Sequence, residues 1–284
     1  MFKSYLSIIK PGIIVGNLFS VICGFFLASQ KNINYLYLLK IIISTSLIIG
    51  SSCVFNNIID CDIDRIMKRT NNRVFPKNII SLKKGFIYAF ILGINGFLLS
   101  FFWMNYLTTF IAFLGFIIYV LFYTAFFKKN SIHSTLIGSL SGATPPVIGY
   151  CSVSNQLDLC SMILFFMFFF WQIPHTYTIA ISRFKDYKKV NIPLLPIKKG
   201  ITITKKYIIF YIFLFTIFNV LLSINGYTSY IFLVVSIILN TLWIAISLYG
   251  FKKDVNNHLW AKKNFLFSIF IITMISVIII FDSL

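Results

Sequence analysis

The stretch that decides the fold is residues 37–64, YLLKIIISTSLIIGSSCVFNNIIDCDID, an apolar run that ends in a cluster of acids. Its first 23 residues contain one charged side chain, Lys40, near their beginning. A helix needs roughly 20 apolar residues to cross the hydrocarbon layer of a bilayer. We therefore expect residues 37–59 to span a membrane, with Asp60, Asp62 and Asp64 following at its surface.

Similar apolar runs recur along the whole chain. Of its 284 residues, 58% are apolar and 11% are charged, whereas about 25% are charged in an ordinary soluble domain. This composition excludes a soluble globular protein. It predicts an all-α polytopic membrane bundle of nine transmembrane helices. The expected spans are 11–29, 37–59, 85–104, 106–127, 134–152, 159–181, 205–224, 228–250 and 263–282. The fifth span is the weakest because it contains helix-breaking Gly and Pro residues, which a packed bundle tolerates.

The basic residues fix an orientation for this bundle. The chain carries a formal net charge of +18, and 23 of its 25 Lys and Arg residues fall on one side if the N-terminus is cytoplasmic. Cytoplasmic loops of membrane proteins carry such an excess. The charge therefore needs no nucleic-acid partner, and we expect none. We treat residues 1–284 as a single membrane domain, with binding and chemistry in two long cytoplasmic loops, 60–84 and 182–206.

The acid cluster after the second span has helical spacing. At about 100° per residue, Asn56, Asp60 and Asp64 lie on one helix face, while Asp62 points nearly the opposite way. Two carboxylates and an amide oxygen are hard ligands of the kind that Mg²⁺ takes, together with substrate phosphates. The alternative is that the acids form local ion pairs. Their partners would then be Arg65, Lys68 and Arg69.

Arginine also suits phosphate binding. Arg65 lies off the acid face if the helix continues, whereas a break at Thr70-Asn71-Asn72 would allow Arg73 to fold back. The second long loop begins Arg183-Phe184-Lys185-Asp186. Asp186 is its only acid, and either pairs locally with those cations or provides a second Mg²⁺ ligand opposite the first cluster.

Cysteine and histidine give weaker signals. The five Cys residues form no CxxC pair, so we interpret them as buried apolar side chains. His175 follows Pro174 inside the sixth span, where it either hydrogen-bonds within the bundle, binds a haem iron or relays protons. No two histidines share one span at ligand spacing, which argues against a haem-anchoring cytochrome.

Four stretches together resemble the UbiA-type intramembrane prenyltransferases. The first is NNIIDCDIDRIMKRTNNRV (56–74), which contains the pattern NxxxDxxxD at Asn56, Asp60 and Asp64. The others are YTAFFK (123–128), GSLSGATPPVIGY (138–150), and WQIPH (171–175) with RFKDYKKVNIPLLPIKKG (183–200). Within that family the likeness is to the branch whose acceptor is haem. Many members carry a second DxxxD, but here Asp186 is followed at the fourth position by Val190.

The resemblance implies transfer of a farnesyl group from farnesyl diphosphate to haem B, with Mg²⁺ as cofactor and haem O and diphosphate as products. We expect Asp60, Asp64 and Asp186 to be catalytic and, with Asn56, to bind the metal. The cations expected to bind diphosphate are Arg65, Lys68, Arg69, Lys128, Arg183 and Lys185. Tyr123 is a candidate for stabilising an allylic cation through its ring, and His175 for orienting haem.

The resemblance also implies a location and partners. We expect a multi-pass protein of the bacterial inner (cytoplasmic) membrane whose active site faces the cytoplasm, associated with a terminal oxidase or another haem-pathway protein. Three other functions stay open at this point: the same fold acting on an aromatic quinone precursor, a membrane transporter, and a haem-binding module without transferase activity.

Overall fold

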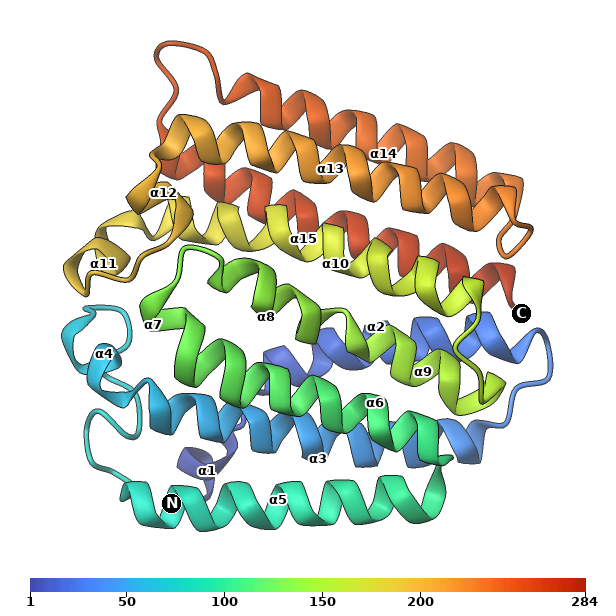
Figure 1. Ribbon diagram of the computed structural model, residues 1–284, viewed down its shortest axis with the longest axis horizontal. Helices are drawn as coiled ribbons and strands as arrows, with labels where there is room; N and C mark the ends of the chain where they lie inside the picture. Colours follow the sequence, from blue (N-terminus) through green and yellow to red (C-terminus); the bar gives the residue numbers. More distant parts are fainter.

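A computed structural model describes all residues, 1–284, as helices and their connections, with no β-strand (Figure 1). The all-α prediction is therefore confirmed. The elements are α1 (Phe2–Ile8), α2 (Pro11–Ser29), α3 (Tyr35–Ile59), α4 (Cys61–Ile66), α5 (Leu82–Trp103), α6 (Tyr106–Ile117), the π-helix η1 (Ile118–Phe127), α7 (Lys128–Asn130), α8 (Ser134–Gly142), α9 (Thr144–Ser154), α10 (Leu159–Ser182), α11 (Phe184–Lys189), α12 (Leu195–Lys198), α13 (Ile201–Ile224), α14 (Tyr230–Tyr249) and α15 (Asn257–Asp282).

Eight continuous helices are long and apolar enough to cross a membrane. The predicted fifth span is instead two short helices, α8 and α9, which run end to end through Ala143 (Figure 1). Pro145 and Pro146 in the first turn of α9 have no N–H to donate to the preceding turn, so the helix is interrupted there. The expected number of nine holds only if this pair is counted as one crossing.

Several helices begin earlier than the sequence predicts, and the difference is largest for two of them. Helix α13 starts at Ile201 rather than 205, and α15 starts at Asn257 rather than 263. The side chain of Asn256 accepts hydrogen bonds from the backbone N–H groups of His258 and Leu259, which caps α15 ahead of its apolar part. The lysines after these starts do not delay the helices: Lys206 and Lys262 are exposed, and the buried Lys205 donates to the backbone oxygen of Gly250.

Helices α2 and α9 cross with unusually close backbones. A Cβ atom added to Gly24 would lie 1.9 Å from the carbonyl oxygen of Pro146, and one added to Gly149 would lie 1.9 Å from that of Val21. Only glycine permits this approach. Small residues commonly allow such contacts between membrane helices. The five cysteines are all free and buried, as predicted.

The outer surface of the bundle is apolar. Large side chains such as Phe102, Phe110, Ile231 and Phe281 are exposed along the long helices, as expected for surfaces that contact lipid. The short helices α4, α7, α11 and α12 gather at one end of the bundle, and the C-terminus lies at the other (Figure 1). We call the end with these short helices the basic end, because the connections 60–81 and 183–200 there are rich in Lys and Arg.

Candidate active site

The predicted face of Asn56, Asp60 and Asp64 is present at the basic end. Helix α3 continues into α4 through Asp60 with near-helical dihedral angles, φ −84° and ψ −1°. The backbone N–H of Asp60 donates to Asn56, and that of Asp64 donates to Asp60, both at 2.9 Å. All three side chains are buried, with exposed fractions of 2–4%, whereas Asp62 is exposed. The helical argument from sequence is confirmed.

The chain turns back directly after these acids. Helix α4 ends at Ile66, and Met67 is extended, so the break comes earlier than the predicted Thr70-Asn71-Asn72. The Thr70 hydroxyl donates to the backbone oxygen of Asp64 at 3.1 Å. This turn brings the Arg73 guanidinium to 2.7 Å from Oδ2 of Asp64, which confirms that Arg73 folds back.

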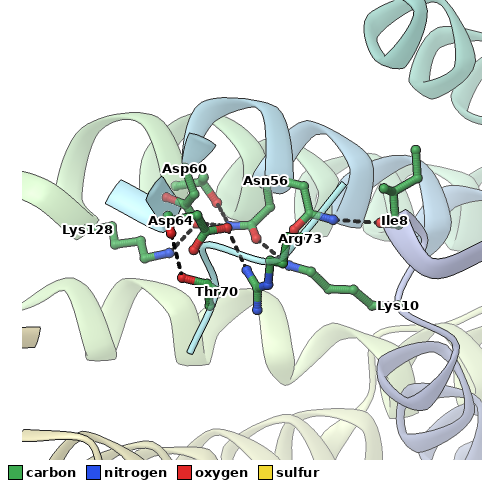
Figure 2. Close-up of polar contacts among 10 residues, drawn as sticks. Ile8, Lys10, Asn56, Asp60, Asp64, Thr70, Arg73 and Lys128 are labelled. Carbon is green, nitrogen blue, oxygen red and sulfur yellow. Dashed lines mark hydrogen bonds and ion pairs between the residues drawn. The ribbon is translucent and has the colours of Figure 1, made fainter. Parts of the chain in front are cut away.

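Two lysines from other parts of the chain complete the cluster (Figure 2). Lys128, which follows η1, forms an ion pair with Oδ2 of Asp60. Lys10, between α1 and α2, donates to Oδ1 of Asn56 at 2.6 Å. The local ion pairs considered from sequence are absent: Arg65 contacts Asn78 instead. Lys68 is exposed.

Lys10 is a site residue that sequence reasoning missed. Its backbone has φ 54° and ψ 69°, a left-handed conformation that is costly for a residue preceding proline. Burial lowers the pKa of its ammonium group to about 8. The only sequence signal is a basic residue next to Pro11 at the start of the first span.

The acid cluster has the chemistry of a cation site. Oδ1 of Asp60 is buried and has no hydrogen-bond partner. An orphaned carboxylate oxygen is costly unless something binds it. Together with Oδ1 of Asn56 and the Asp64 carboxylate, it provides hard oxygen ligands on one face. The residues present therefore fit Mg²⁺.

A cavity of about 400 Å³ opens beside Asp64. Its polar lining includes two cations, Lys10 and Arg73, and the amides of Asn57 and Asn72. Positive charge next to carboxylates suits an anionic ligand that arrives with its own cation, as a metal diphosphate does.

The second long connection meets the first at the basic end. Ile63 and Met67 pack in one buried cluster with Ile192 and Leu194. Desolvation and then the charge of Arg183 lower the pKa of Arg69, which lies in the first of these connections. The two connections thus pack against each other at the basic end.

The structure does not gather Asp186 with the other acids into one metal group. Asp186 lies in the first turn of α11, half-buried and without an ion-pair partner. No three His, Cys, Asp or Glu side chains come together as metal ligands anywhere in the chain. Arg183 is half-buried and Lys185 is exposed. Neither forms an ion pair with the carboxylates of the acid cluster.

Tyr123 and His175 occupy different surroundings. The Tyr123 ring lies 6.0 Å from Nζ of Lys128, so it borders the acid cluster. His175 stacks between Trp171 and Phe265, with ring centroids 4.8 and 4.9 Å away. Its Nδ1 is 2.7 Å from the hydroxyl of Ser268. Both sequence interpretations of His175 remain compatible with this arrangement, since only one ring nitrogen is bonded.

The structure is thus an intramembrane helical bundle with a buried NxxxDxxxD face and cations that converge on it. Residues 17–270 match the UbiA prenyltransferase family, and the chain belongs to that family. It is 49% identical over 284 residues to the protoheme IX farnesyltransferase of Pectobacterium carotovorum, covering 100% of this chain and 96% of the relative. It is 50% identical over 282 residues to that of Photorhabdus laumondii, covering 99% and 96%.

Solved structures share the fold. The chain superposes with a TM-score of 0.83 on a structure reported for digeranylgeranylglyceryl phosphate synthase, at 23% identity, covering 99% of this chain and 98% of that one. A UbiA homolog from Archaeoglobus fulgidus bound to GPP and Mg²⁺ gives a TM-score of 0.69 at 16% identity, covering 98% and 99%. The chain is thus a multi-pass membrane enzyme of a prenyltransferase family.

Proposed function

We propose that this chain transfers the farnesyl group of farnesyl diphosphate to a vinyl group of haem B, and that the product is haem O. The observation that carries the proposal is 49% identity, over the whole chain, to a protein named for this reaction. The C1–O bond of farnesyl diphosphate breaks and diphosphate leaves. A new C–C bond forms to the vinyl group, and water adds to the resulting cation with loss of a proton.

Asn56, Asp60 and Asp64 would hold the metal of this reaction. The support for this is their shared buried face and the orphaned Oδ1 of Asp60. The A. fulgidus homolog, whose structure holds GPP and Mg²⁺, makes magnesium the natural choice. When bound, Mg²⁺ would neutralise charge on the diphosphate and so ease ionisation of the allylic bond. Asp186 would act from the second loop as an additional acid near the same substrate.

The cations around the acids would serve the leaving group. Lys128 and Arg73 form ion pairs with the carboxylates, and Lys10 donates to the Asn56 amide. We propose that they turn to diphosphate oxygens when substrate binds, since a phosphate oxygen competes well for such donors. Arg69, Arg183 and Lys185 would add positive charge from the two loops, as would the exposed Arg65 and Lys68.

Two residues with ring side chains would act on the allylic cation and on the haem acceptor. Tyr123 borders the acid cluster, where its ring face would stabilise an allylic cation. Nε2 of His175 makes no hydrogen bond, which leaves it able to contact haem.

We further propose that residues 1–284 form one membrane domain, with the basic end in the cytoplasm of a bacterium. Haem B would be the acceptor, and a terminal oxidase or haem-pathway protein would be a partner.

The acceptor can be tested by competition. The purified protein in lipid would receive labelled farnesyl diphosphate with equal amounts of haem B and an aromatic quinone precursor. The proposal predicts that label appears on haem. Label on the aromatic acid alone would overturn the acceptor while keeping the prenyltransferase chemistry. An Asp60→Ala variant serves as the inactive control.

A further inference from the structure

Thr124 is a buried residue of η1 that no part of the proposed reaction yet uses. Its exposed fraction is 0%, and its hydroxyl lies 3.2 Å from Nδ2 of Asn56. The same Nδ2 lies 2.9 Å from Oδ2 of Asp60. Asn56 therefore has its amide N–H groups directed at two acceptors and its Oδ1 facing Lys10.

The hydroxyl of Thr124 can act toward Asn56 only as a hydrogen-bond acceptor. It donates its one proton to the carbonyl oxygen of Tyr119 at 2.8 Å. A hydroxyl that has donated its proton can only accept from other neighbours. Asn56 must therefore present its NH₂ group to Thr124, and its carbonyl oxygen must point the other way, toward Lys10.

The π-helix makes the Tyr119 contact possible. Thr124 bonds to the carbonyl five residues back. Threonine hydroxyls in the α-helices of this chain bond three or four residues back, as Thr178 and Thr216 do. The wider turn of η1 is rare in proteins and is frequent at functional sites. Here it aligns the Thr124 hydroxyl with Asn56, one turn before Lys128 reaches Asp60.

We propose that Thr124 is a positioning residue that fixes the polarity of the Asn56 amide, so that its Oδ1 is presented to a metal ion. The inference rests on the proposed metal site. Thr124 is suited to this task because its hydroxyl carries no charge. The other acceptor of Nδ2, Asp60, is itself a proposed ligand and is shared with Lys128. Without Thr124 the amide is held by Asp60 and Lys10 alone. Once the metal and diphosphate engage those two groups, the terminal torsion of Asn56 is soft and the NH₂ group can replace the oxygen.

The test measures metal binding and not turnover alone. Mn²⁺, a probe for the Mg²⁺ site, would be titrated with inorganic diphosphate into the protein in lipid nanodiscs, and free Mn²⁺ would be followed by electron paramagnetic resonance. Thr124→Val keeps the branched shape but removes the hydroxyl. We expect it to weaken Mn²⁺ binding by about fivefold to tenfold, the ratio for one ordinary hydrogen bond. Thr124→Ser should restore binding to within about twofold, on the same scale. Thr216→Val is the control for a lost helix hydroxyl away from the site.

A double-mutant cycle decides whether Thr124 acts through Asn56. In an Asn56→Ala background, Thr124→Val should produce no further loss of Mn²⁺ affinity. Equal losses for the Val and Ser variants, or a full additional loss in that background, would overturn the inference. If Thr124→Val does not fold, Thr124→Ala is compared with Thr124→Ser in the same cycle. Absence of Mn²⁺ binding by the unmodified protein would instead overturn the proposed metal site.

Discussion

The ion pair between Asp60 and Lys128 allows the structural role of an acid to be separated from its chemical role. Asp60→Asn keeps the size of the side chain and removes its charge. Lys128 then stays in place with no counter-ion, next to Arg73 and Lys10. The exposed fractions of the paired side chains are 4% for Asp60 and 19% for Lys128. The variant should therefore lose stability as well as activity.

The loss can be estimated from these exposures. Removing one partner of a fully buried pair costs about 3–5 kcal/mol. Because Lys128 keeps partial access to solvent, we expect about 2–3 kcal/mol. At roughly 2–4 °C per kcal/mol for a chain of this size, the melting temperature should fall by about 5–10 °C. Adding Lys128→Met removes the unpaired positive charge as well, and should recover most of the lost stability.

The five buried cysteines provide the assay. Heating the protein in detergent and lipid with a thiol-reactive dye reports unfolding as the thiols become accessible. We expect Asp60→Asn to unfold earliest and the Asp60→Asn/Lys128→Met double variant to unfold near the unmodified protein, with both lacking transferase activity. Asp62→Asn, at an exposed position, is the control. A double variant less stable than Asp60→Asn, or one that is active, would refute the reasoning.

Three further results are expected. Asp64→Asn should abolish transfer while Asp62→Asn keeps most of it, because only Asp64 lies on the buried face; product assays giving equal losses would contradict that geometry. Gly24→Ala should destabilise the bundle by about 1–3 kcal/mol or more through overpacking, since its Cβ would meet a carbonyl oxygen at 1.9 Å. Gly16→Ala, with nothing within 4 Å, should be neutral in the same thermal assay, and similar effects at both positions would count against the close helix crossing. Removing divalent metal with EDTA should stop transfer and Mg²⁺ should restore it, whereas unchanged activity would exclude a metal-dependent mechanism.

Local periodicity predicted much of this structure. The face shared by Asn56, Asp60 and Asp64 follows from helical geometry alone, and the hydropathy pattern located the long helices to within a few residues. The split between α8 and α9 was signalled by the prolines at residues 145 and 146. These features depend on residues near each other in the chain, so sequence is sufficient for them.

The partners of the acids depend on tertiary packing instead. Asp60 pairs with a lysine 68 positions away, and Asn56 with one 46 positions away. Neither separation has a sequence signature, which is why local arginines were the natural alternative. The π-helix was also unforeseen, because Ile118–Phe127 has the composition of an ordinary apolar helix.

The most direct test of the account is the mass of haem after incubation with the protein. The protein in lipid would receive haem B and farnesyl diphosphate in heavy-oxygen water, with and without Mg²⁺. We expect haem to gain one farnesyl group and one labelled hydroxyl, with release of diphosphate, only when Mg²⁺ is present. Unchanged haem with intact farnesyl diphosphate, from protein shown to be folded, would contradict the central claim.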